Sequence, residues 1–170
     1  MSEQSVKETS AVFLNGESAM VSFGENLATY LSEGMLITLK GDLGAGKTTL
    51  SRGLFRGLGH RGAVKSPTYT IVEPYNLSFG MVYHFDLYRV NDPQELDYIG
   101  FSDYLDTAAL SVVEWPEHGR DYLSEVDVHL TIGHRLNGRT IVLEARSEMG
   151  KNFIDRVTDC DFFTDHAITI

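Results

Sequence analysis

One stretch of the sequence, Gly41–Thr48, reads Gly-Asp-Leu-Gly-Ala-Gly-Lys-Thr. This order matches the pattern G-x-x-x-x-G-K-[ST], which is typical of a loop that holds the phosphates of a nucleotide. In such a loop Lys47 reaches the β- and γ-phosphates, and the Thr48 hydroxyl is a ligand of Mg²⁺. The stretch therefore predicts a site for the phosphates of a nucleotide and for Mg²⁺, lined by Asp42, Leu43, Gly44, Ala45, Gly46, Lys47, Thr48 and Thr49.

The residues on either side of the loop supply the elements that a phosphate loop needs. Met35–Leu39 is a compact apolar run, which indicates a buried strand, and Thr48–Leu58 has a helical pattern that Gly59 ends. The backbone N–H groups of the loop and the helix N-terminus then face the anion. A chance match to the bare pattern would lack this context, so the sequence favours a functional loop.

Two carboxylates follow apolar runs that are predicted to be strands. Asp86 comes directly after Met81–Phe85, and Glu114 comes directly after Leu110–Val113. A phosphate loop needs at least one more acidic group to fix Mg²⁺, directly or through water. A single acid at a strand end is usually a helix cap or a surface charge, but two beside this loop predict a metal role for at least one. The spacing leaves open which of them touches the ion.

The sequence allows two roles for each of three further residues. Thr68, in Ser66-Pro67-Thr68-Tyr69, is placed where a switch could sense the γ-phosphate or the metal, although Ser-Pro-Thr is also an ordinary turn. Arg89 is equally suited to pair with phosphate or to form an ion pair. Trp115 is either a core aromatic or a surface anchor that reports the nucleotide state to a partner.

The order of the elements predicts an α/β fold, a three-layer sandwich of the P-loop NTPase type with a mixed sheet that is parallel at its centre. Strands near Leu36, Val82 and Val112 would carry their carboxyl ends to one edge, where open α/β sheets bind ligands. Val126–Ile132 and Arg139–Ala145 both alternate in polarity, which predicts a C-terminal antiparallel hairpin. The other expected elements are an edge strand at Ala11–Leu14, a helix from Ser18 to Ser32 capped by Ser18, extended chain over Tyr69–Tyr75, a helical turn at Gln94–Tyr98, a short helix at Phe101–Leu105 capped by Ser102, and a final helix at Lys151–Val157.

Length and composition fit one globular domain over residues 1–170. Apolar residues make up 42% and charged residues 22% of the chain. Residues 1–10 are predicted to be a flexible tail, and residues 158–170 a variable C-terminal tail. Cys160 is the only cysteine, so no internal disulfide or thiolate zinc cluster is expected. No run approaches membrane-spanning length, and we expect a cytoplasmic protein.

The net charge of −10, from 24 acidic and 14 basic residues, argues against unaided binding to DNA or RNA. It is compatible with a basic partner, or with a complex in which another subunit holds the nucleic acid. The simplest interpretation is a solvated surface that favours solubility.

Four motifs occur in an order that resembles the TsaE (YjeE) family of bacterial P-loop ATPases. The resemblance covers roughly residues 12–155 and rests on Gly41-Asp42-Leu43-Gly44-Ala45-Gly46-Lys47-Thr48-Thr49, Val64-Lys65-Ser66-Pro67-Thr68-Tyr69-Thr70, Tyr83-His84-Phe85-Asp86-Leu87-Tyr88-Arg89 and Val113-Glu114-Trp115-Pro116.

This resemblance implies a role in making N6-threonylcarbamoyladenosine (t6A), the modified nucleoside beside the anticodon of tRNAs that read codons beginning with A. It implies that the protein binds the TsaB–TsaD heterodimer, in which TsaD performs the transfer, and hydrolyses ATP to keep the assembly turning over. Contact with tRNA would be only indirect, and no membrane or DNA is involved. It further implies Lys47 as the phosphate lysine, Thr48 and Glu114 as Mg²⁺ ligands, Asp86 as a catalytic or metal-organising carboxylate, Thr68 as part of the switch and Trp115 as a neighbour of the nucleotide.

Two other functions remain open from the residues. A small-molecule kinase usually has an arginine-rich lid, and the sequence shows no clear segment of this kind. A nucleotide-gated switch with little catalysis is the second. A GTPase of that type would carry the guanine-reading pattern N/T-K-x-D, which the chain lacks.

Overall fold

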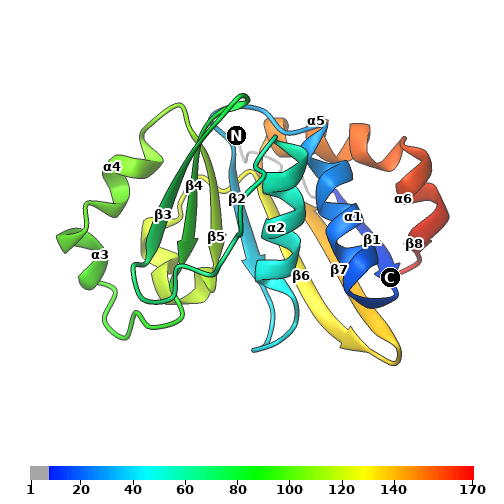
Figure 1. Cartoon of the computed structure of the whole chain (residues 1–170), viewed down its shortest axis with the longest axis horizontal. Coiled ribbons are helices and arrows are strands. Elements are labelled where there is room, and N and C mark those ends of the chain that lie inside the picture. The colour runs from blue at the N-terminus through cyan, green and yellow to red at the C-terminus, as the bar shows by residue number, and fades with distance from the viewer. Residues whose placement is uncertain (1–7) are drawn as a thin grey trace, which may run out of the picture.

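The computed structural model describes residues 8–170, which form one mixed sheet of eight strands with helices on both faces (Figure 1). The strand order is β3-β4-β5-β2-β6-β7-β1-β8. The strands are β1 (Thr9–Leu14), β2 (Leu36–Lys40), β3 (Val72–Leu77), β4 (Gly80–Asp86), β5 (Leu110–Glu114), β6 (Val128–Arg135), β7 (Gly138–Ala145) and β8 (Ala167–Ile168). The helices are α1 (Gly16–Ala28), α2 (Lys47–Gly57), α3 (Glu95–Tyr98), α4 (Phe101–Leu105), the 3₁₀ segment η1 (Pro116–Tyr122), α5 (Glu148–Thr158) and α6 (Asp161–His166).

The centre of the sheet is parallel and both flanks are antiparallel. Strands β4, β5, β2 and β6 run in one direction, while β3 pairs with β4, and β7 with β6 and β1, in antiparallel register. The predicted mixed sheet and C-terminal hairpin are confirmed. Because β6 is itself parallel to β2, the reversal of direction begins only at β7.

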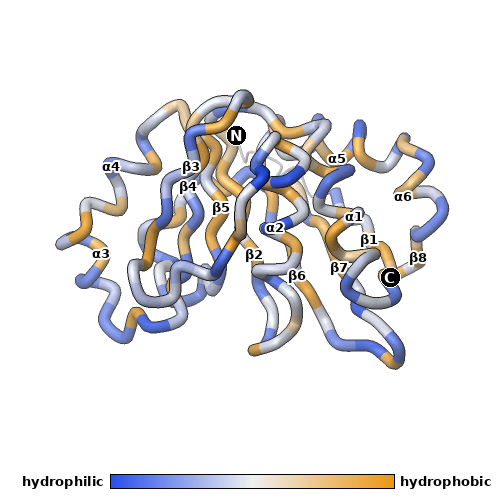
Figure 2. Tube along the Cα trace, viewed as in Figure 1, coloured by the Kyte–Doolittle hydropathy of each residue, from blue (hydrophilic) through white to orange (hydrophobic). Residues whose placement is uncertain are grey.

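Two apolar clusters hold helices against opposite faces of the sheet. The larger contains Ile37, Leu39 and Val112 together with side chains of α1, α2, α5 and α6. The smaller contains Leu36 and Val113 together with residues around α3, α4 and η1. Neighbouring residues of one strand therefore belong to different clusters, as the two-residue period of a strand requires. Figure 2 shows the hydrophobic residues that run along β5 between these layers.

Both ends of the described chain carry more regular structure than the sequence indicates. Thr9 and Ser10, assigned to the tail in the sequence-based prediction, belong to β1, and the rest of that predicted tail, residues 1–7, lies outside the described residues. The stretch 158–170 contains α6 and β8, because Phe163 is buried in the larger cluster. Strand β8 pairs with β1, so Ala11–Leu14 is not the edge strand that was predicted.

Two predicted caps are wrong. Helix α1 begins at Gly16 and follows Asn15 rather than Ser18, and it ends at Ala28. Helix α4 follows Gly100, whose φ of 68° lies in the left-handed region that glycine adopts without strain. Ser102 lies inside that helix. Among the described helices, none is long and apolar enough to cross a membrane.

Candidate functional site

The glycine-rich loop joins β2 to α2 at the carboxyl edge of the parallel strands. Gly44 and Gly46 have φ values of 75° and 109°, which side chains disfavour. A Cβ atom on Gly41 would lie 2.6 Å from the carbonyl oxygen of Ile132, too close for any other residue. The loop conformation therefore depends on its glycines, as the sequence pattern requires.

Lys47 is the first residue of α2, and its side chain bends back onto the loop. Its Nζ donates to the carbonyl oxygens of Gly41 at 2.5 Å and Asp42 at 2.8 Å. The ammonium also lies 3.9 Å from the centroid of the Trp115 ring, a cation–π contact. Burial lowers the pKa of the Lys47 ammonium, while nearby carboxylates, Glu114 first, oppose that shift. The loop therefore holds a positive charge where phosphate is predicted to bind.

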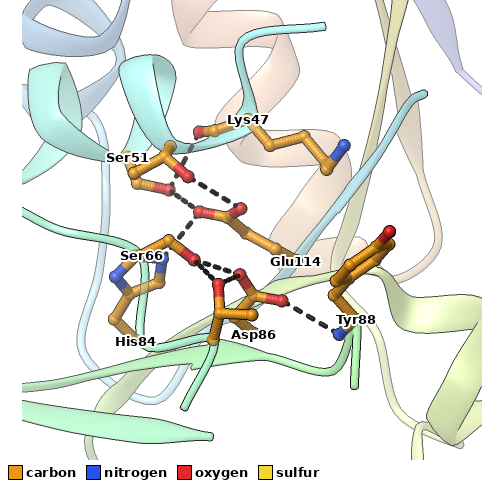
Figure 3. A network of polar contacts seen from close by, with 9 residues as sticks. Lys47, Ser51, Ser66, His84, Asp86, Tyr88 and Glu114 are labelled. Carbon is orange, nitrogen blue, oxygen red and sulfur yellow. Dashed lines mark hydrogen bonds and ion pairs between the residues drawn. The ribbon is translucent and has the colours of Figure 1, made fainter. Parts of the chain in front are cut away.

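Glu114, at the end of β5, accepts hydrogen bonds from three side chains (Figure 3). Its Oε2 accepts from the Thr48 hydroxyl at 3.0 Å. Its Oε1 accepts from the Ser51 hydroxyl at 3.3 Å and lies 2.8 Å from Nε2 of His84. The carboxylate is 1% exposed. The structure thus brings together Thr48 and Glu114, the two predicted metal ligands.

Asp86, at the end of β4, organises the segment that contains Thr68. Its Oδ2 accepts from the hydroxyls of Ser66 and Thr68, the latter at 2.9 Å (Figure 3). Its Oδ1 accepts from the backbone N–H of Tyr88 at 2.9 Å. The carboxylate therefore fastens the predicted switch segment to the edge of the sheet.

The backbone of Ile71, two residues after Tyr69, is strained. Its φ is 67°, and for a β-branched residue this left-handed conformation is a genuine outlier. Two backbone hydrogen bonds hold it: the Ile71 N–H donates to the Pro67 carbonyl oxygen at 2.7 Å, and the Asp86 N–H donates to the Ile71 carbonyl oxygen at 2.9 Å.

The Arg89 guanidinium stacks over the Tyr69 ring, 4.2 Å from its centroid. Neither of the two sequence-based interpretations of Arg89 included this contact.

Trp115 takes a position between the two readings that the sequence left open. The residue is half-buried, and its φ of 58° turns the chain sharply after β5. Its ring packs at 4.9 Å between centroids against Tyr88, in addition to its contact with Lys47. The indole therefore borders the phosphate loop rather than filling the core.

Three residues of this site were not predicted. Ser51 lies one helical turn after Thr48, so the i, i+3 spacing on α2 could have revealed that both face Glu114. His84 shares a face of β4 with Asp86 because the two are two residues apart. Arg139 of β7 donates from Nε to the Ala45 carbonyl at 2.9 Å and from Nη2 to the Gly44 carbonyl at 3.4 Å. No sequence signal links β7 to the loop.

The donor set fits Mg²⁺. A hydroxyl and a carboxylate are the hard oxygen donors that this ion prefers, and it usually takes only one or two carboxylates plus substrate phosphates. Across residues 8–170 no group of three or more His, Cys, Asp or Glu side chains is placed to hold a metal unaided. The residues that would hold the ion are Thr48 and Glu114.

Comparisons with known proteins identify the family of the chain. The family model described as "Threonylcarbamoyl adenosine biosynthesis protein TsaE" matches residues 14–141. The tRNA threonylcarbamoyladenosine biosynthesis protein TsaE of Haemophilus influenzae is 44% identical over 152 residues, 86% of this chain and 96% of that protein. The protein of the same name from Synechocystis is 44% identical over 109 residues, 62% of this chain and 69% of that protein.

The fold is also similar to a solved structure. The crystal structure of YdiB from Bacillus subtilis superposes with a TM-score of 0.75 at 25% sequence identity, over 89% of this chain and 95% of that chain. The family model spans the glycine-rich loop, both carboxylates and Arg139. The chain therefore belongs to the TsaE family.

Proposed function

We propose that this protein is a Mg²⁺-dependent ATPase that binds the TsaB–TsaD heterodimer and supports t6A modification of tRNAs. The observation that carries the proposal is the placement of Glu114. Its Oε2 lies 3.0 Å from the hydroxyl of Thr48, directly after the phosphate lysine. A carboxylate and a hydroxyl at the mouth of a phosphate loop form the metal-binding half of an ATPase site.

The loop would bind the phosphates of ATP through Lys47 and through backbone N–H groups. Lys47 is held by two carbonyl oxygens and the Trp115 ring, so it would exchange these contacts for phosphate oxygens. Thr48 and Glu114 would hold Mg²⁺, which would supply positive charge to stabilise the developing negative charge.

Asp86 and Thr68 would respond to the γ-phosphate. The Thr68 hydroxyl donates a hydrogen bond to Asp86. It can release this bond and either donate to a phosphate oxygen or coordinate a metal ion through its oxygen. The strained backbone at Ile71 lowers the cost of moving the segment, because a rearrangement could relieve it. Asp86 Oδ2, which would still accept from Ser66, would then have a lone pair available to orient the attacking water. We assign it the catalytic role and Thr68 the sensing role.

The acidic net charge is consistent with an indirect role in tRNA modification. The net charge of −10 disfavours direct contact with tRNA phosphates, so we assign RNA binding to the partner subunits. We expect the ATPase activity of this protein in the cytoplasm.

The test follows the γ-phosphate of labelled ATP with the chain alone, and with TsaB–TsaD plus tRNA. Inorganic phosphate released much faster with the heterodimer supports a partner-activated ATPase. Label that appears on another molecule indicates a kinase. A rate of phosphate release that is the same with and without the heterodimer contradicts the proposed partnership. Mixing the chain with tRNA alone at physiological salt should show weak or no binding, and tight binding would overturn the indirect role.

A further inference from the structure

The His84 side chain is buried on β4, between the sheet and α2, and the proposed ATP hydrolysis assigns it no role. It is 0% exposed. Its ring packs in a T-shaped arrangement with the Phe55 ring, with 5.2 Å between centroids, and Nε2 lies 2.8 Å from Oε1 of Glu114. Among residues 8–170 its other nitrogen, Nδ1, has no hydrogen-bond partner.

The hydrogen-bond roles of the pair follow from these contacts. An ionised carboxylate only accepts, so Nε2 of His84 donates to Glu114. A proton on Nδ1 would be buried without an acceptor, which is costly, and the ring therefore adopts the Nε2–H tautomer. The imidazole thus makes one directed hydrogen bond, and that bond ends on the predicted metal ligand.

The two oxygens of Glu114 are engaged differently. Oε1 receives both His84 and Ser51, whose hydroxyl also lies 3.1 Å from the Lys47 carbonyl. Oε2 receives only the Thr48 hydroxyl. The single Ser51 proton is shared between Oε1 and the Lys47 carbonyl, so the His84 bond, which comes from a separate element, β4, is the stronger restraint on rotation of the carboxylate. Oε2 is left facing the side of Thr48.

We propose that His84 is a positioning residue that fixes Glu114 through Oε1, and that it thereby sets the affinity and selectivity of the site for Mg²⁺. The inference rests on the proposed function, because it takes Thr48 and Glu114 to be the metal ligands. Mg²⁺ demands near-ideal octahedral geometry, whereas Ca²⁺ accepts flexible arrangements. A loosened Glu114 therefore weakens Mg²⁺ binding more than Ca²⁺ binding.

Two amide substitutions separate positioning from simple core filling. His84→Gln places an N–H donor near the position of Nε2, within reach of Glu114, whereas the shorter side chain of His84→Asn places it near Nδ1. Both variants bury one amide in the same apolar surroundings. Thr38→Val is the control for general destabilisation, because it removes a different buried contact, the 2.5 Å pair between Thr38 and His129.

The experiment measures ADP binding by calorimetry without metal and over titrations of Mg²⁺ and Ca²⁺, after melting curves have established that each variant folds. ADP avoids turnover, so the readout does not depend on activity. We expect His84→Asn to weaken Mg²⁺ binding to the ADP complex about tenfold, the lower end of the effect of removing a metal ligand's partner. Ca²⁺ binding should change less, metal-free ADP affinity should hold within about twofold, and His84→Gln should restore most of the Mg²⁺ affinity.

The inference is overturned if His84→Asn keeps the wild-type Mg²⁺ affinity, or loses ADP affinity equally with and without metal, or is not rescued by His84→Gln. If His84→Asn does not fold, Ser51→Ala provides the measurement, since it removes the second donor to Oε1 and should weaken Mg²⁺ in the same direction. Glu114→Ala tests the proposed function separately. If Glu114→Ala leaves Mg²⁺ binding intact, the metal site itself is misplaced; if Glu114→Ala abolishes it while the His84 variants do not respond, only the positioning role fails.

Discussion

Asp86 and Glu114 occupy paired register positions at the ends of the neighbouring parallel strands β4 and β5, yet they belong to separate hydrogen-bond networks. Glu114 is joined to α2 through Thr48 and Ser51, whereas Asp86 is joined to the segment around Thr68. One carboxylate is thus connected to the phosphate loop and the other to the predicted switch. This division suggests that substitutions at the two acids have different consequences.

Glu114→Ala should retain nucleotide and lose Mg²⁺-dependent turnover. The variant keeps the loop and Lys47 but removes the carboxylate beside Thr48. We expect kcat to fall at least about 100-fold, because a bound metal contributes several kcal/mol of charge stabilisation. Steady-state phosphate release and metal-free ADP binding, measured together, check this. Normal ATPase activity in Glu114→Ala would remove the residue from the metal site.

Lys47→Ala should lose phosphate affinity itself. A hydrogen bond to a charged group contributes about 1.5–3 kcal/mol, so we expect ADP to bind about 10- to 100-fold more weakly, with or without Mg²⁺. Calorimetric titration with ADP and with adenosine provides the check, since adenosine lacks the phosphates and should be unaffected. Equal losses for both ligands would contradict the role of Lys47 as the phosphate lysine.

Thr68→Val should reduce the preference for ATP over ADP. The substitution keeps the shape of the side chain but removes the hydroxyl that bonds to Asp86 at 2.9 Å. We expect the ratio of the two affinities to fall about tenfold or more, because a hydrogen bond to a charged phosphate oxygen contributes about 1.5–3 kcal/mol. The matched control is Thr70→Val, at an exposed position of the same segment. A ratio that both variants leave unchanged would show that Thr68 is only part of a turn.

Arg139→Met should loosen the phosphate loop. The guanidinium holds the Ala45 carbonyl at 2.9 Å, and a planar trans peptide then turns the Gly46 N–H away from Arg139. Without this bond the loop must be ordered by the ligand, so we expect ADP to bind about tenfold more weakly and loop amides to exchange faster. Arg146→Met, just beyond the other end of β7, is the control. Unchanged amide exchange in Arg139→Met would contradict this account.

Protonation of His129 should lower the stability of the folded chain at acidic pH. Burial lowers the pKa of its ring, opposed by the carboxylate of Glu144, so the unfolded chain binds more protons than the folded chain just below pH 6.5. The His129 contribution is therefore complete above pH 6.5 and is lost as the pH falls through the folded pKa. Denaturant midpoints at pH 7.5 and 5.5 should differ less in His129→Gln than in the wild type. The exposed His134→Gln should leave the difference unchanged.

The sequence was sufficient to predict the parts of the site that follow from strand ends and loop chemistry. Thr48 and Glu114 meet because parallel strands share one carboxyl edge, and Asp86 follows from the same rule. Arg139 could not be predicted, because its contact with the loop depends on how far the β6–β7 hairpin extends beyond β2. The left-handed backbone of Ile71 was equally inaccessible, since propensity favours extended structure for a β-branched residue. The caps at Asn15 and Gly100 were missed because serine nearby gave a stronger local signal.

The two outer strands of the sheet restrict how the protein can associate. Strand β3 carries Pro74, which has no N–H to offer a further strand, and β8 presents only two residues. Neither edge strand is a good template for the addition of another strand, so copies of the chain are protected from edge-to-edge pairing of their sheets. Recognition by another protein must then depend on side chains and loops rather than on shared backbone ladders.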